Sequence, residues 1–237
     1  MATFKRLQEQ AYDYLKELIL SGEMIENEIY SETKLASEIG ISRTPIRDAL
    51  QRLSQDGFID IIPSKGFRIH QITANEIVEI FQIRSAIEGF CTFLITSQYK
   101  EPRAVETISK LKHLLDKQKD ILLGDKNLNS FAEYDTLFHT TIVSYAQNTE
   151  FDKMFNNYMY RIKKLALDSL SHEGRLETTL KEHTDIFNNI ANGCIEDIYR
   201  TTLIHMETPK YINLEDFVTI SYFSIILSFI KNISISN

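Results

Sequence analysis

Apolar residues recur at helical spacing in two short stretches near the start of the chain. Those of the first stretch are Leu35, Ala36 and Ile39. The stretch ends at Gly40, where a residue without a side chain allows the chain to turn. Those of the second are Ile46, Ala49, Leu50 and Leu53. We expect Thr44 to cap this second helix, Pro45 to be its first residue and Gly57 to end it.

A β-rich stretch follows these two predicted helices. Residues 58–62 and 67–69 flank Pro63-Ser64-Lys65-Gly66, a sequence typical of a hairpin with a basic tip. Two helices, a tight turn and a hairpin predict a winged helix-turn-helix, in which the start of the second helix enters the major groove. Arg43 and Arg47 lie there as hydrogen-bond donors. The alternative, a solvated helix pair with scattered arginines, explains none of these features together.

The same residues carry a resemblance. It rests on Glu32-x-x-Leu35-Ala36, the run from Gly40 to Leu50, Leu53, Asp56-Gly57-Phe58-Ile59 and Gly66. The segment resembles the winged helix of GntR-type bacterial transcription regulators. The resemblance implies that double-stranded operator DNA is contacted by Ser42, Arg43, Thr44, Arg47, Lys65 and Gly66. Thr33 departs from the pattern, because many members carry Arg or Lys at that position.

From residue 73 onward the pattern is helical almost throughout. Thr73-Ala-Asn-Glu76 is a capping box that opens a long apolar helix. Breaks near residues 102, 124, 148, 174 and 193 divide the rest into about six helices, which is typical of an antiparallel bundle. We therefore expect a mainly α fold: a DNA-binding winged helix-turn-helix over residues 1–72 and an all-helical effector-binding and dimerisation domain over 73–237. The pattern does not define residues 207–237.

Four residues of the predicted bundle have the chemistry of a metal site. Asp135 and His139 are four residues apart, so both leave the same helix face. His183 and His205 lie on later helices beside apolar neighbours. Imidazole nitrogens and a carboxylate suit a divalent metal ion, zinc or nickel above all. The alternative is a set of unrelated histidines, to which we assign the other three: His70, His113 and His172.

A second resemblance rests on this region. The pattern consists of Arg84-x-x-x-Glu88, Asp135-x-x-x-His139, Glu182-His183-x-x-Ile186 and His205. It resembles the FCD effector domain of FadR-like GntR regulators, in the shorter VanR-like, metal-binding form. The resemblance implies a metal held by Asp135, His139, His183 and His205, and a small organic acid bound beside it. Arg84 and Arg161 are candidates to clamp the acid's carboxylate.

Composition and charge narrow the functional classes. The chain has 237 residues, 43% of them hydrophobic, and a net charge of −7, which argues against a nonspecific DNA-coating protein. Its two cysteines are too few for a disulfide framework and indicate core residues in a reducing compartment. The apolar run 217–230 is shorter than the roughly 17–25 residues that span a membrane. We expect this run to be buried or dimer-facing.

These observations predict a cytoplasmic, homodimeric, ligand-responsive transcription regulator, most simply a repressor, and not an enzyme. One alternative is a metal-dependent hydrolase with a DNA-binding appendage, because Asp135 and the three histidines could activate a water. That alternative lacks a general base, since Glu182 is adjacent to His183 and is expected to point away from it. Another alternative is an architectural DNA binder whose bundle serves only to dimerise.

Overall fold

The structure is a computed structural model that describes the backbone of residues 2–235 and the side chains of residues 7–219. The chain divides into two compact units, Met1–Ile72 and Thr73–Asn237. Each unit has its own buried core, and each is described by itself.

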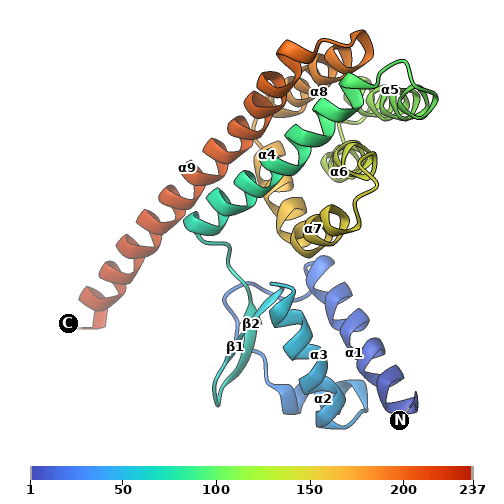
Figure 1. Cartoon of the computed structure of the whole chain (residues 1–237). Helices are drawn as coiled ribbons and strands as arrows, with labels where there is room; N and C mark the ends of the chain where they lie inside the picture. The colour runs from blue at the N-terminus through green and yellow to red at the C-terminus, as the bar shows by residue number, and fades with distance from the viewer. Residues whose placement is uncertain (1, 236–237) are drawn as a thin grey trace. The chain divides into compact units, whose positions relative to one another are not determined.

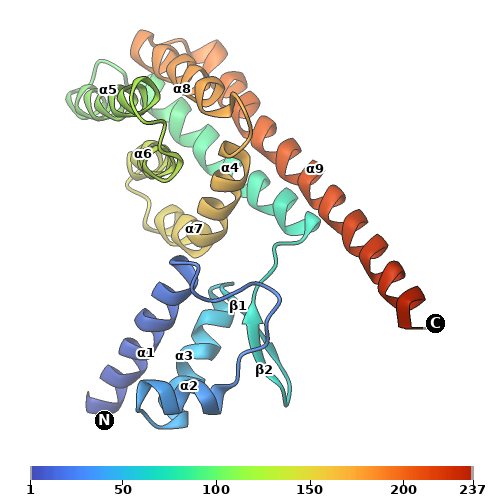
Figure 2. The same ribbon diagram turned by 180° about the vertical axis from the view of Figure 1, so that it is seen from behind.

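The first unit is a winged helix-turn-helix (Figure 2). Its elements are α1 (Ala2–Leu20), α2 (Glu32–Ile39), α3 (Arg43–Gln55), β1 (Ile59–Ile62) and β2 (Gly66–Ile69). The two strands are antiparallel, with Ile59 opposite Ile69. Helix α1 packs against α3, and the core includes Leu15, Ile46, Leu50 and Leu53, all nearly inaccessible to solvent.

The turn between α2 and α3 forms where the sequence predicts it. Gly40 ends α2 in the left-handed conformation, with φ 74°. The start of α3 differs from the expectation, because Ser42 is the N-cap and Arg43 the first helical residue. Pro45 therefore lies third in the helix, where a missing N–H also costs no intrahelical hydrogen bond. The expected Thr44 cap is wrong by two residues for this reason.

The hairpin between β1 and β2 is held by a segment that precedes α2. Tyr30 exchanges two backbone hydrogen bonds with Phe67, of 2.7 and 3.0 Å, and its ring stacks on the Phe67 ring. Gly66 has φ 127°, and a Cβ added there would collide with the carbonyl oxygen of Tyr30. The hairpin therefore requires glycine at this position.

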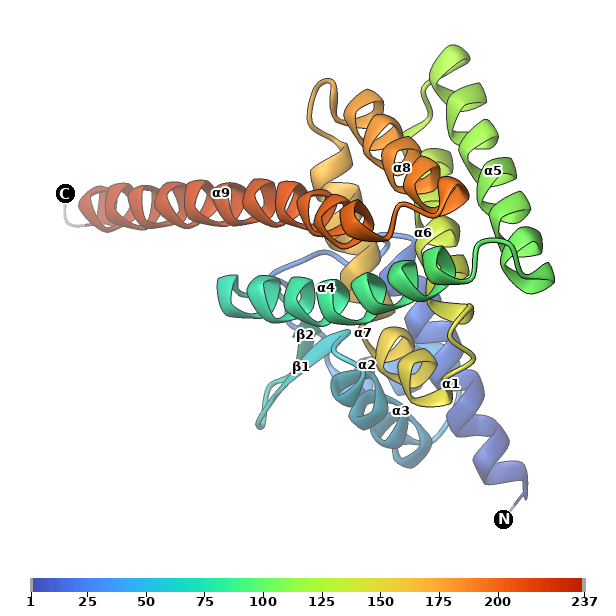
Figure 3. The ribbon, with the colours of Figure 1, turned by 45° about the horizontal axis from the view of Figure 1, so that its top comes forward.

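The second unit is an all-α bundle, as predicted (Figure 1). Its described elements are α4 (Ala74–Ser97), α5 (Pro102–Leu123), α6 (Leu128–Ser144), α7 (Thr149–Leu170), α8 (Arg175–Asn192) and α9 (Ile195–Ile235). The predicted capping box is present, with the Thr73 and Glu76 side chains each bonded to the other's backbone N–H. Helices α4 and α9 run side by side in opposite directions (Figure 3), and Gly89 makes room for the Tyr199 ring between them.

The segment that the sequence pattern did not define continues helix α9. Pro209 lies inside this helix, and the backbone stays helical to Ile235. Val218, at the start of the apolar run, is 64% exposed in the single chain. The remaining side chains of the run, from residue 220, lie outside the described residues. Within the described part of the chain, no helix is long and apolar enough to span a membrane.

We predict that Gly66→Ala destabilises the first unit. The new methyl group meets the Tyr30 carbonyl, and the positive φ adds backbone strain of about 1–3 kcal/mol. Gly22→Ala is the matched control, because Gly22 also has a positive φ but its Cβ would meet no atom within 4 Å. In urea unfolding, Gly66→Ala should lose clearly more free energy of unfolding than Gly22→Ala. Equal losses would contradict the proposed collision.

Candidate functional site

The residues expected to contact DNA form two exposed groups in the first unit. Ser42, Arg43, Thr44 and Arg47 lie in the N-cap and first two turns of α3, and their side chains are exposed. Lys65 is exposed in the turn between β1 and β2, and Gly66 begins β2. A helix start with free donors and a basic turn are the two features with which a winged helix contacts the groove and the phosphates.

Arg47 and Arg52 have different surroundings on α3. The Nε and Nη2 atoms of Arg47 each lie 3.3 Å from the Glu32 carboxylate on α2, while 63% of the Arg47 side chain stays exposed. The Arg52 guanidinium instead covers the Tyr12 ring at 4.1 Å and pairs with Asp56 at 3.9 Å. Both side chains are thus more than half exposed, but Arg47 is held by one acid near the start of α3, whereas Arg52 lies further along the helix against Tyr12 and Asp56.

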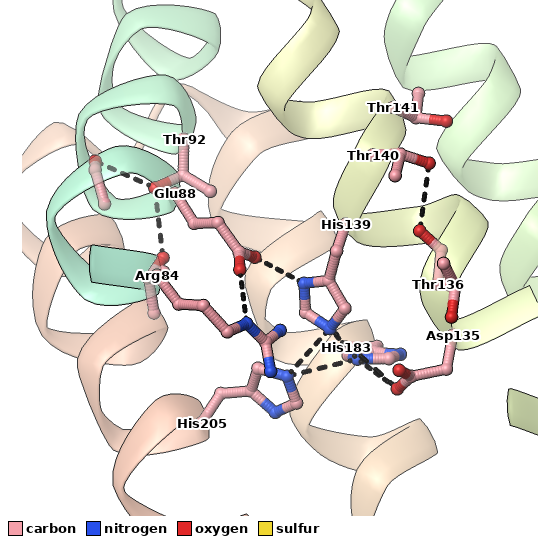
Figure 4. Close-up of polar contacts among 12 residues, drawn as sticks. Arg84, Glu88, Thr92, Asp135, Thr136, His139, Thr140, Thr141, His183 and His205 are labelled. Carbon is pink, nitrogen blue, oxygen red and sulfur yellow. Dashed lines mark hydrogen bonds and ion pairs between the residues drawn. The ribbon is translucent and has the colours of Figure 1, made fainter. Parts of the chain in front are cut away.

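In the second unit, three imidazole rings from three helices meet in the interior of the bundle. His139 comes from α6, His183 from α8 and His205 from α9, and each is at most 3% exposed. Their Nε2 atoms are separated by 3.3 Å (His183–His139), 3.3 Å (His183–His205) and 3.2 Å (His205–His139) (Figure 4). Nitrogen ligands of a tetrahedral zinc ion are about 3.3 Å apart, which follows from zinc–nitrogen bonds of about 2.0–2.1 Å. The spacing therefore suits one ion bound by all three nitrogens.

Asp135 lies beside two of these rings. Its Oδ1 atom is 3.5 Å from the Nε2 of His183 and 3.8 Å from the Nε2 of His139. Asp135 precedes His139 by one turn of α6, so the helix itself places both side chains on this face. A carboxylate in this position can be the fourth ligand of a divalent cation.

The opposite nitrogen of each ring has its own partner. The Nδ1 atom of His139 lies 2.5 Å from Glu88, that of His205 lies 2.7 Å from Glu182, and that of His183 lies 3.0 Å from Gln118. When Nδ1 carries the hydrogen and donates it to these oxygens, each Nε2 has a free lone pair that faces the other two.

The sequence did not predict two of these contacts, those of Glu182 and Gln118. Glu182 does not point away from the site, because the His205 ring of α9 reaches it from the other side; the expectation drawn from its neighbour His183 was wrong. Gln118, on α5, was missed, since a glutamine among the polar residues of a helix carries no signal in the sequence.

The carboxylates of Glu88 and Glu182 are each paired with a buried arginine. Glu88 lies 2.8 Å from the Nε of Arg84, and Glu182 accepts two 2.8 Å hydrogen bonds from Arg175. Burial raises the pKa of Glu88, but Arg84 and His139 lower it more, so the pKa falls to about 2. The pKa of Glu182 is also about 2, because His205 and Arg175 outweigh the effect of burial. Both groups are carboxylates at neutral pH.

Burial lowers the pKa of two of the histidines. That of His183 falls well below its usual range, and the nearby His205, His139, Arg175 and Arg84 lower it further. Burial also lowers the pKa of His205, although Glu182 opposes the shift. A low pKa favours the neutral imidazole, which is the form that binds metals.

Several buried polar atoms of the second unit find no hydrogen-bond partner among the described residues. They are Arg84 Nη2, Gln118 Nε2, Arg161 Nε, Ser169 Oγ, Arg175 Nε and Thr179 Oγ1. Every one of these six can donate a hydrogen bond, so the interior has unused donors that an acceptor-rich ligand would satisfy.

The two arginines expected to clamp an effector lie in different places. The positive charge of Arg84 lowers the pKa of His183, and its guanidinium donates a hydrogen bond to Glu88, the partner of His139. Arg161 pairs with Glu76 at 3.2 Å, in the first turn of α4. Glu76 precedes Arg84 by eight residues, or about 12 Å along a helix axis. The structure therefore brings Arg84, and not Arg161, to the histidines.

The other histidines have separate surroundings. His70 pairs with Asp60 at 2.7 Å in the first unit, and the exposed His172 pairs with Asp216 at 2.9 Å. His113 is exposed on α5. Among the described residues, the cluster that could hold a metal ion consists of His139, His183 and His205.

Comparisons with known proteins match both units of the chain. The gntR family of bacterial regulatory proteins matches residues 7–69, and the FCD domain matches residues 79–208. An uncharacterised HTH-type transcriptional regulator, YdhC of Bacillus subtilis, is 26% identical over 83% of this chain and 86% of its own length. The gluconate operon transcriptional repressor of Bacillus licheniformis is 29% identical over 74% of this chain and 69% of its own.

Solved structures show the same fold. A GntR regulator from Rhodococcus covers 86% of this chain and 95% of its own with a TM-score of 0.68 at 16% identity. The match to McbR/YncC of Escherichia coli covers 89% of this chain and 98% of that protein, with a TM-score of 0.68 at 17% identity. The FCD match alone spans more than half of the chain, so the protein belongs to the FCD-domain regulators of the gntR family, which are DNA-binding transcriptional regulators and not enzymes.

Proposed function

We propose that this regulator is a homodimeric repressor that senses a small organic acid at a divalent metal centre in the second unit. The observation that carries the proposal is the convergence of three imidazole nitrogens at 3.2–3.3 Å in a buried site. The proposed ligands are Asp135, His139, His183 and His205, and the proposed metal is zinc or nickel. Bound there, the metal would supply a positive charge with Lewis acidity.

The metal centre would attract an anion. One carboxylate, that of Asp135, neutralises only half of the charge of a divalent ion, and the nearby carboxylates of Glu88 and Glu182 are already paired with Arg84 and Arg175. Arg84 uses its Nε on Glu88 and has an unused Nη2. A carboxylate that bound the metal with one oxygen and Arg84 with the other would satisfy both groups.

DNA binding would use the two exposed groups of the first unit. We propose that Ser42, Arg43, Thr44 and Arg47 enter the major groove of operator DNA, and that Lys65 and Gly66 of the hairpin contact the adjoining backbone. Support comes from the exposure of these side chains and from the Glu32 contact, which holds the Arg47 guanidinium at the surface. Such a protein would act in the cytoplasm, where operators are.

We infer repression, and not activation, from the names of two relatives. The gluconate operon regulator of Bacillus licheniformis is named a repressor, and a probable repressor of D-xylose utilisation in Paenarthrobacter nicotinovorans is 25% identical over 81% of this chain. We infer that effector binding in the second unit changes how well two winged helices of a dimer fit one operator. An architectural DNA binder would show no such response, so calorimetric titration with organic acids separates the two functions.

We predict that Arg47→Ala weakens operator binding by about 1–3 kcal/mol without unfolding the first unit. Arg43→Ala should act similarly, because both guanidinium groups lie at the start of α3. Arg52→Ala is the control, since that side chain is engaged with Tyr12 and Asp56. Fluorescence anisotropy with operator DNA measures the affinities. Unchanged binding in both the Arg43 and the Arg47 variants would remove the recognition-helix assignment.

We predict that the protein carries one metal ion per chain and that His183→Ala or His205→Ala removes most of it. Each substitution deletes a ligand and removes a hydrogen bond, to Gln118 for His183 and to Glu182 for His205, so the melting temperature should also fall. The response to an organic acid should weaken, whereas operator binding without effector should persist, because the first unit has its own core.

Elemental analysis of protein purified without chelators or nickel resin measures the metal content. His113→Ala, which changes an exposed histidine of α5, is the matched control and should keep its metal. A wild-type protein that holds no metal, and takes up none from added zinc, nickel or manganese, would overturn the proposed centre.

We predict a dimer with twice the 27.5 kDa mass of the chain, because reading two operator half-sites requires two winged helices. Light scattering coupled to size-exclusion chromatography measures this mass directly. A monomer at micromolar concentration, with and without operator DNA, would contradict the dimer.

A further inference from the structure

The three histidines of the cluster differ in the partner of their Nδ1 atom. Glu88 and Glu182 are carboxylates paired with Arg84 and Arg175, so they only accept hydrogen bonds. They require hydrogen on the Nδ1 of His139 and of His205, and in a neutral ring this leaves the lone pair on Nε2. Gln118 is different, because a carboxamide has an oxygen that accepts and an NH₂ group that donates.

The close approach of the three Nε2 atoms is favourable only when a cation or a shared hydrogen lies between the rings. Three Nε2 lone pairs at 3.2–3.3 Å repel one another in a buried site unless a cation or a hydrogen is shared between them. Three neutral rings can relieve this repulsion when the hydrogen of one ring moves from Nδ1 to Nε2. That ring would then donate to a neighbouring Nε2 or to Asp135, whose Oδ1 lies 3.5 Å from His183.

Only His183 has a partner that permits this change. If the hydrogen moves to Nε2, the Nδ1 of His183 becomes an acceptor, and a half-turn of the Gln118 amide presents NH₂ to it. This half-turn breaks no other hydrogen bond of the amide, because the Nε2 of Gln118 has no partner among the described residues. Phe138 stacks on the His183 ring at 4.3 Å, so the ring keeps its plane while the hydrogen changes position.

We propose that Gln118 is a positioning residue that sets the tautomer of His183: amide oxygen toward Nδ1 in the metal-bound protein, and amide NH₂ toward Nδ1 in the metal-free protein. The change rests on the proposed metal centre and moves one hydrogen within the ring, with no change of net charge. His139 and His205 keep the same tautomer in both states. Gln118 thus allows the buried cluster to exist without its metal.

The direct test is the tautomer of each ring, measured from two-bond ¹H–¹⁵N couplings in protein with ¹⁵N-labelled histidine. In chelator-treated wild-type protein, His183 should have hydrogen on Nε2, whereas His139 and His205 have it on Nδ1. After addition of one equivalent of zinc, all three should have hydrogen on Nδ1. A His183 tautomer that is the same in both states would overturn the proposal, and so would a charged ring at His139 or His205 in the metal-free protein.

Variants of Gln118 test the role of the acceptor. Gln118→Leu offers no oxygen to Nδ1, so we expect zinc to bind about 10–100-fold more weakly. Gln118→Glu keeps an acceptor and cannot donate, so zinc affinity should be restored and His183 should keep hydrogen on Nδ1 even without metal. Gln82→Leu and Gln82→Glu, at an exposed position of α4, are the matched controls and should bind zinc like wild type.

The outcomes separate this proposal from the metal centre itself. Wild-type protein that takes up no zinc would overturn both. Protein that takes up zinc while His183 keeps one tautomer, or a Gln118→Leu variant that binds zinc as tightly as wild type, would overturn the role of Gln118 and leave the metal centre standing.

Discussion

The interior of the second unit depends on three imidazole nitrogens that face one another in a buried space. Histidines in such a position cost free energy unless each nitrogen has a partner. The bundle meets this requirement at the three Nδ1 atoms with polar side chains from α4, α5 and α8 behind the rings. Two buried arginines then balance the two carboxylates. An apolar core of the same size would need none of these groups, so their presence indicates that the site, rather than stability, dictates this part of the sequence.

Helical spacing and cap residues account for the parts that the sequence predicted well. The bundle breaks and the capping box at Thr73 depend on residues close together in the chain, and the structure has them where they were expected. The start of α3 was misplaced because proline fits several positions of a first turn equally well. Local rules thus predict that a helix exists more firmly than they predict its first residue.

The surroundings of the histidines could be predicted only in part. Asp135 and His139 share one helix turn, so their proximity follows from spacing alone. The direction of Glu182 depends on where α9 places His205, and the place of Gln118 depends on the packing of α5 against α8. Such contacts join residues that are 23 and 65 positions apart. No periodicity along a single helix contains this information.

The position of α4 in the chain suggests how the proposed site could influence DNA binding. This helix begins at Ala74, a few residues after β2 ends at Ile69, and it carries both Arg84 and Glu88. An acid bound to Arg84 would act on the same helix whose first turn is tied to α7 by the Glu76–Arg161 ion pair. A small rotation of α4 would therefore move the covalent connection to the winged helix. Under this mechanism, Arg161 matters for transmission of the signal and not for binding of the acid.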